Sequence, residues 1–134
     1  MVDSRATLAY CPGMSGAHQK STAISVVLAD IDAGRKPEGA ALADAVRALL
    51  RALTAAAPGR TVEVRVPPYG AVQCGEGPRH TRGTPPNVVE TDPVTWVRLA
   101  TGRLTWPDAL AEGRLRASGN RTDLSRYLPL EYCK

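Results

Sequence analysis

The sequence contains no phenylalanine and has only two tryptophans and four tyrosines among its 134 residues. Proteins that bind single-stranded nucleic acid stack the bases on aromatic side chains, and this chain has few of them. Its formal net charge is nevertheless +4, because fourteen arginines and three lysines outnumber thirteen acidic residues. Excess positive charge favours anionic partners of every kind without choosing among them. We therefore expect no nucleic-acid partner.

Residues that carry chemistry are scarce. His18 and His80 are the two histidines, and neither belongs to a metal-binding motif. The chain has three cysteines, an odd number without C-x-x-C spacing: Cys11, Cys74 and Cys133. This pattern predicts neither a disulfide framework nor a zinc site. Cys74 is the best candidate nucleophile, but no neighbouring cation is evident, so a small buried side chain is the favoured interpretation. We expect no catalytic residue, no metal and no cofactor.

Long apolar runs are also absent. The longest, over residues 24–29, is far shorter than the about 18–20 residues that a membrane span requires. The first residues lack the basic region and apolar segment of a secretion signal. We therefore expect a cytoplasmic protein without stable membrane insertion. Its 43% hydrophobic and 22% charged residues are typical of a globular domain.

Hydrophobic periodicity predicts the first elements. Residues 1–20 have none and are expected to form a flexible N-terminal arm, followed by a single domain over residues 21–134. Apolar residues at helical spacing predict a helix from Ser21 to Gly34 and a second one that ends before Pro58. Strict alternation over 61–66 predicts a half-buried strand, and residues 71–74 return as the second strand of a hairpin.

The second half alternates strands and helices. Residues 75–86 lack periodicity, and a solvated basic loop is favoured there over an anion site. A strand over 87–90 then leads to a helix capped by Asp92 and to a shorter one that starts at Thr105. A strand over 114–118 is expected to turn Leu115 and Ala117 inward, and a last helix to run from Thr122 to Pro129. This order predicts an α+β fold with a mixed or antiparallel sheet of about four to five strands and helices on one face.

The segment VVETDPVTWVRLATGRLTWPDALAEGRLRASGN, residues 88–120, resembles the C-terminal half of the sterol-carrier-protein (SCP) domain. In both, a strand meets an acidic cap, a helix ends at Thr-Gly-Arg, a second helix follows, and a strand closes in G-x-L-x-x-x-G-N. With residues 57–69 added, the chain is similar to the small sterol-carrier-like proteins of actinobacteria, over roughly residues 41–130. The resemblance implies an SCP-like α+β fold around an apolar tunnel.

Such a tunnel takes sterols, fatty acids or fatty acyl-CoA without covalent chemistry, so the resemblance implies lipid binding or lipid transport. The residues that would form its wall are Trp96, Leu99, Ala100, Leu104, Trp106, Leu110, Leu115, Leu124 and Leu128. The residues that would hold an anionic head group are Arg79, His80 and Arg82 in the loop, Arg98 and Arg103 at the helix, and Arg114 or Arg116 at the strand. For each wall residue, packing in an ordinary core is the alternative.

The chain also departs from the family pattern. Two strands precede the loop where the family has three, and only five residues follow Pro129. A protein-interaction or accessory module with a closed tunnel is therefore the competing hypothesis, with a protein partner or a homo-oligomer left open. A related module is the C-terminal domain of mycothiol-dependent isomerases. That domain follows a metal-binding helical bundle, for which the first 40 residues offer only His18 and a few carboxylates.

Overall fold

The computed structural model of the chain describes residues 15–77 and 87–131, with side chains from residue 22 onward. The described elements are α1 (Ser15–Asp32), α2 (Gly39–Ala56), β1 (Val62–Val66), β2 (Gly70–Cys74), β3 (Val88–Thr91), α3 (Pro93–Ala100), α4 (Trp106–Ala111), β4 (Leu115–Ser118) and the 3-10 turn η2 (Ser125–Tyr127). This arrangement confirms the α+β fold predicted from the sequence.

The four described strands form one mixed sheet in the order β2-β1-β3-β4. β1 pairs with β2 antiparallel, which confirms the predicted hairpin, and Val64 lies opposite Val72 in it. β1 also pairs with β3 in parallel, and β3 pairs with β4 antiparallel. Because β1 and β3 are parallel neighbours, their carboxyl ends meet at one edge of the sheet, where β4 begins.

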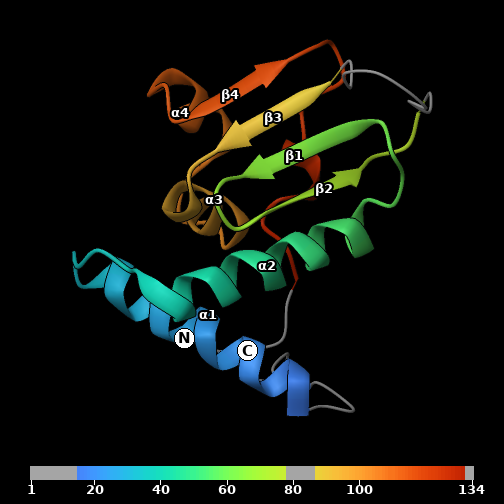
Figure 1. Cartoon of the computed structure of the whole chain (residues 1–134). Helices are drawn as coiled ribbons and strands as arrows, with labels where there is room; N and C mark the ends of the chain where they lie inside the picture. Colours follow the sequence, from blue (N-terminus) through green and yellow to red (C-terminus); the bar gives the residue numbers. More distant parts are fainter. Residues whose placement is uncertain (1–14, 78–86, 132–134) are drawn as a thin grey trace, which may run out of the picture.

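The alternation in β1 separates a buried face from a polar one. Val62, Val64 and Val66 are buried, whereas Glu63 and Arg65 point to the opposite face and are half-buried. Helices α2 and α3 lie against the valine face, and α1 crosses α2 on the side away from the sheet (Figure 1). The main core therefore lies between the sheet and the α2–α3 layer.

α2 is a long helix with an apolar stripe. Leu42, Val46, Leu49 and Leu53 repeat at helical spacing and are buried, which matches the predicted helix. α1 packs on α2 through Ile24 and Val27. It begins six residues before the predicted start at Ser21, so helix covers the last part of the expected arm. The first 14 residues of that arm lie outside the described residues.

Two predictions for the C-terminal part are wrong. The helix expected between Thr122 and Pro129 is only the turn η2. Leu128 precedes Pro129 and is extended, because a residue before a proline is disfavoured in helical conformation, so the turn ends at Tyr127. Ala117 was expected to face inward but is exposed, whereas Leu115 is buried. β4 is the edge strand, and α4 contacts it where it begins, so the core does not extend to its far end.

Candidate functional site

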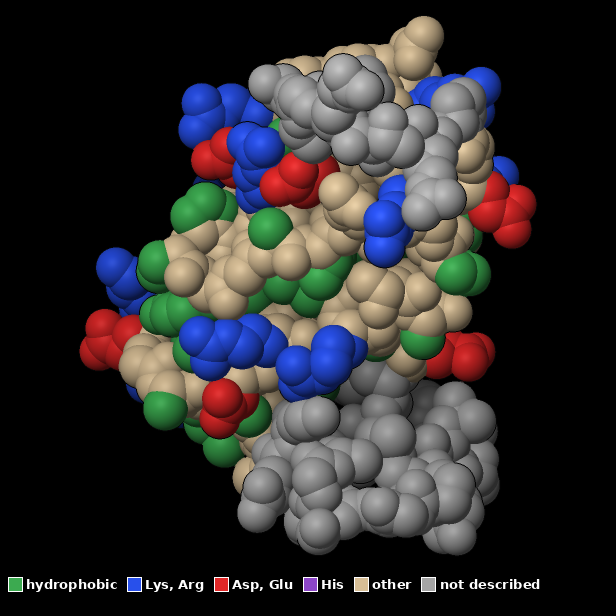
Figure 2. All heavy atoms as spheres, turned by 45° about the vertical axis from the view of Figure 1, so that its right-hand side comes forward, with side chains coloured by type: hydrophobic (Ala, Val, Ile, Leu, Met, Phe, Trp, Pro, Cys, Tyr) green, Lys and Arg blue, Asp and Glu red, His purple; other side chains and the backbone are tan. Residues whose placement is uncertain are grey.

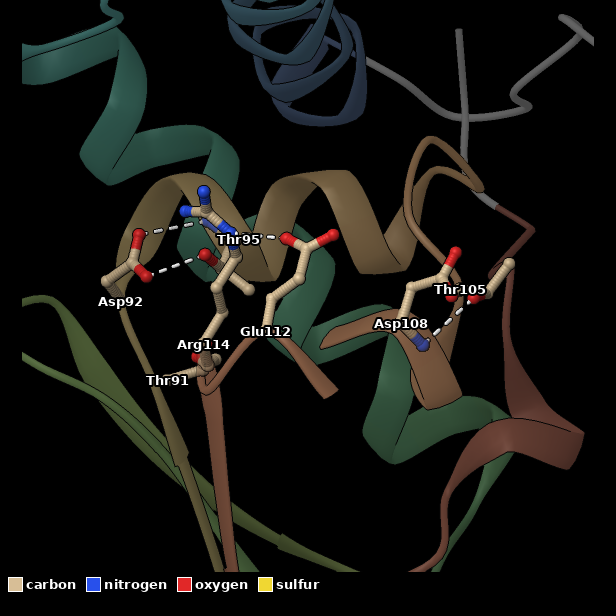
Figure 3. A network of polar contacts seen from close by, with 7 residues as sticks. All are labelled: Thr91, Asp92, Thr95, Thr105, Asp108, Glu112 and Arg114. Atoms are coloured by element: carbon tan, nitrogen blue, oxygen red, sulfur yellow. Dashed lines mark hydrogen bonds and ion pairs between the residues drawn. The ribbon is translucent and has the colours of Figure 1, made fainter. Parts of the chain in front are cut away.

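A polar cap positions the first helix of the candidate ligand site. Asp92 precedes Pro93, and its carboxylate accepts hydrogen bonds from the Thr95 main-chain N–H at 3.0 Å and the Thr95 hydroxyl at 2.6 Å (Figure 3). The cap satisfies main-chain donors that a helix start leaves unpaired. Thr105 caps α4 in the same way, accepting from the Asp108 N–H at 3.2 Å. Both predicted caps are confirmed.

The cap places Trp96 at the centre of the core. Its side chain is 2% exposed, and its indole N–H donates to the Val46 carbonyl oxygen of α2 at 3.3 Å. The indole hydrogen bond satisfies the single polar group of an otherwise apolar side chain. Trp96 therefore ties α3 to α2 through both packing and a hydrogen bond.

Most of the predicted wall residues meet in this one core. They come from three helices or helix junctions, one strand and the C-terminal segment. The buried ones are Trp96, Leu99, Ala100, Leu104, Trp106, Leu115 and Leu124. The other two differ: Leu128 is half-buried, and Leu110 is 45% exposed, because α4 turns Trp106 and Ala109 inward instead. The side chains brought together thus form a continuous apolar cluster between the sheet and the helices.

The predicted head-group residues do not form one group. Arg79, His80 and Arg82 lie outside the described residues. Arg103 makes a two-pronged ion pair with Asp32 of α1, with Nε–Oδ1 and Nη2–Oδ2 distances of 2.8 Å each. Arg98 is half-buried in the last turn of α3. On the face shown in Figure 2, Lys and Arg side chains are spread among hydrophobic and acidic ones rather than gathered in one patch.

The Arg103–Asp32 pair is the basis of a pH prediction. Hydrogen bonding from the Arg103 guanidinium holds the pKa of Asp32 below its ordinary value. The ion pair therefore stabilises the contact between α1 and Arg103 when the pH is above the ordinary pKa of an aspartate. This stabilisation is lost as the pH falls through the lowered pKa of Asp32. We expect Arg103→Gln to raise the pKa of Asp32 toward its ordinary value, as measured by carboxyl-carbon NMR. Arg35→Gln, which breaks the neighbouring pair with Asp30, should leave Asp32 unchanged; equal shifts in both variants would contradict the assignment.

Cys74 lies at the end of β2 with none of its surface exposed. Burial away from water raises the pKa of its thiol to about 11. A thiol acts as a nucleophile in its deprotonated form, which this environment disfavours. The structure thus supports the interpretation of Cys74 as a small core residue. Among the described residues, no group of three or more His, Cys, Asp or Glu side chains is placed to hold a metal ion.

The surface of the described residues has hollows in at least three places. One of about 470 Å³ lies at the carboxyl ends of β1 and β3. One of about 170 Å³ lies between the open end of the β1–β2 hairpin and the C-terminal segment, and one of about 440 Å³ lies beside Gly59 and Gly75. Of the predicted wall residues, only Leu124 borders any of these three hollows.

The first hollow is lined mostly by charged and polar residues, which the sequence did not suggest as a unit. Its lining residues are Pro67, Glu90, Thr91, Asp92, Gly113, Arg114 and Arg116. The two arginines were expected at the rim of a lipid site, but the acidic residues were interpreted only as strand and cap residues. Alternation within each strand shows that Glu90 and Arg116 face away from the core. Their pairing depends on the register between β3 and β4, which the sequence does not specify.

Comparison with known proteins identifies the family. The model of the family described as bacterial SCP ortholog matches residues 38–130, which includes every described element except α1. A search of curated proteins finds no match to the chain. Among residues 15–77 and 87–131, no helix combines the length and apolar character needed to cross a membrane. The matched segment agrees closely with the resemblance over residues 41–130, and the chain belongs to the bacterial SCP ortholog family.

Proposed function

We propose that this protein binds an apolar ligand of the lipid class, a fatty acid, fatty acyl-CoA or sterol-like molecule, without catalysing a reaction on it. Family membership supports the lipid class. The observation that carries the proposal is the continuous apolar cluster around Trp96, Leu99 and Trp106, which lies between the sheet and the helices. Each buried methylene contributes about 0.8 kcal/mol, so a chain of about ten could contribute about 8 kcal/mol before ordering costs.

Binding requires the layers around this cluster to separate, because its side chains are buried from the surface. The α2–α3 layer and the sheet are joined across it by apolar contacts, which are non-directional. A bound chain would replace contacts between Leu and Val side chains with contacts to methylene groups. The ligand therefore lies beside Trp96, and this position can be tested directly.

The test uses the two tryptophans as position markers. Trp106→Phe leaves Trp96 as the only tryptophan, and Trp96→Phe leaves Trp106. Each variant of the full chain is titrated with dibrominated stearic acid, whose bromine atoms quench indole fluorescence on close approach, and with unbrominated stearic acid as the matched control. We expect saturable quenching of Trp96 at a one-to-one ratio and its reversal by the unbrominated acid. Absence of quenching, or quenching only where the acid forms micelles, would refute the proposal.

The second candidate is a protein-interaction module with a closed core. The observation that favours it is that most of the predicted wall residues are buried against one another and that, of the nine, only Leu124 borders one of the three hollows described. Under this hypothesis brominated stearic acid leaves both tryptophans unquenched. Native mass spectrometry of the protein purified without delipidation would then show the bare 14.2 kDa chain rather than a chain with a bound lipid.

A further inference from the structure

The hollow at the carboxyl ends of β1 and β3 lies outside the apolar cluster. Pro67 follows β1, Thr91 and Asp92 end β3 and begin α3, and Gly113 precedes β4. In sheets with parallel strands, ligands bind beyond the carboxyl ends of those strands. The volume of about 470 Å³ is within the range of small-molecule sites. Position and size therefore fit a small ligand.

Arg114 is held in place at this hollow. Its Nε donates to the Glu112 carboxylate at 2.7 Å, and its main-chain oxygen accepts from the Thr91 hydroxyl at 2.7 Å. Figure 3 shows its side chain extending from the start of β4 toward the first turn of α3. Within the described part of the chain, its terminal Nη atoms donate to no acceptor. The half-exposed guanidinium thus keeps donors for an anionic group.

Arg116 and Glu90 are less tightly engaged. The distance from Arg116 Nη2 to Glu90 Oε2 is 3.8 Å, too long for a hydrogen bond, and the Arg116 side chain is 82% exposed. The neighbouring pair of Arg65 and Glu63 on the same sheet face is close by comparison, at 2.9 Å. Each member of the long pair can therefore contact a ligand group of opposite charge.

Asp92 has a different role at the same hollow. Both of its carboxylate oxygens accept hydrogen bonds from Thr95, so it is committed to capping α3. Glu90 is the acidic side chain of the lining that accepts no hydrogen bond within the described part of the chain, although the charges of Arg116 and of its cross-strand neighbour Arg65 lie near it. Two arginine side chains and one available carboxylate around a single hollow match a ligand that carries both signs of charge.

We propose that this hollow binds a small zwitterion of the amino-acid type, with its carboxylate on Arg114 and Arg116 and its ammonium group on Glu90. Arginine and carboxylate form strong charge-assisted hydrogen bonds with matching planar geometry. Glu90 adds discrimination, because a simple carboxylate would meet its negative charge without compensation. This site is separate from the proposed lipid site, so either can be present without the other.

The test is an amide NMR titration of the full chain. The zwitterionic probes are β-alanine, 4-aminobutyrate and 5-aminovalerate, which differ in the separation of their charges, and the matched single-charge probes are butyrate and butylammonium. We expect saturable shifts at Thr91, Gly113 and Arg114, with the best zwitterion binding about tenfold more tightly than either single-charge probe.

Three substitutions, two of them at exposed residues and one at the half-buried Glu90, separate the contributions of the charges. Arg116→Gln should weaken binding of the best zwitterion about tenfold. Glu90→Gln should reduce the affinity for this zwitterion to the affinity that the unchanged protein has for butyrate. Arg51→Gln removes one positive charge from the exposed face of α2 and should have no effect on binding. The proposal is overturned if no zwitterion gives saturable shifts, if butyrate binds as tightly, or if Arg51→Gln and Arg116→Gln weaken binding equally.

Discussion

Replacing Leu99 with alanine is expected to lower the free energy of unfolding by about 2–5 kcal/mol, the range for removal of a buried leucine side chain. Leu99 is 1% exposed and belongs to the apolar cluster between α3, α2 and the sheet. The cost combines lost burial with the cavity left behind, because a packed core relaxes only partly. Urea denaturation followed by circular dichroism measures the difference.

Leu110→Ala is the matched control, since Leu110 belongs to the same family segment but is 45% exposed. Its free-energy change should stay within about 0.5 kcal/mol, as for other surface substitutions. A cost below about 1 kcal/mol for Leu99→Ala would contradict tight packing there and would place open space beside Leu99, as a preformed ligand tunnel requires. The unfolding free energies of the two variants therefore distinguish a packed core from an open tunnel beside Leu99.

The local sequence was sufficient to predict the elements that depend on local patterns. The alternating valines of β1 and the leucine stripe of α2 are strong periodic patterns, and Asp92 and Thr105 are strong caps. The prediction was wrong where tertiary position decides. Ala117 continues the inward alternation of β4, yet this edge position has no helix over it. The start of α1 was also missed, because its first turns precede the apolar stripe that begins at Ile24.

The candidate site was predictable in part, for the same reason. Apolar side chains such as Trp96 and Leu115 were expected to line a tunnel, and they lie together in one buried cluster; whether they form a tunnel wall stays a prediction, because a packed core and a tunnel wall require the same residue types. The roles of the arginines could not be predicted, because each depends on a distant partner. Asp32, which pairs with Arg103, lies 71 positions away in the sequence. Glu90 and Arg116 meet only through the pairing of β3 with β4.

Gly59→Ala is expected to destabilise the protein by about 3–5 kcal/mol, because it combines backbone strain with a steric overlap. Gly59 has φ +139°, and a Cβ there would overlap the carbonyl group of Gly75. At this close approach the end of β2 packs against the connector between α2 and β1. The Gly75 N–H donates to the Ala57 carbonyl oxygen at 2.8 Å, and the Gly75 carbonyl oxygen accepts from the Thr61 N–H at 3.3 Å. The sequence pattern predicted only that the second helix ends before Pro58 and did not indicate this contact.

Gly34→Ala separates the two contributions. Gly34 has φ +78°, and nothing lies within 4 Å of a Cβ placed there, so only the backbone cost of about 1–2 kcal/mol remains. Urea denaturation gives both free energies, and amide hydrogen exchange locates the damage. In Gly59→Ala, exchange should accelerate first at Thr61 and Gly75, whose N–H groups close this junction. Equal losses of stability in the two variants would mean that the main chain at Gly75 moves aside freely and that the hairpin does not depend on this contact.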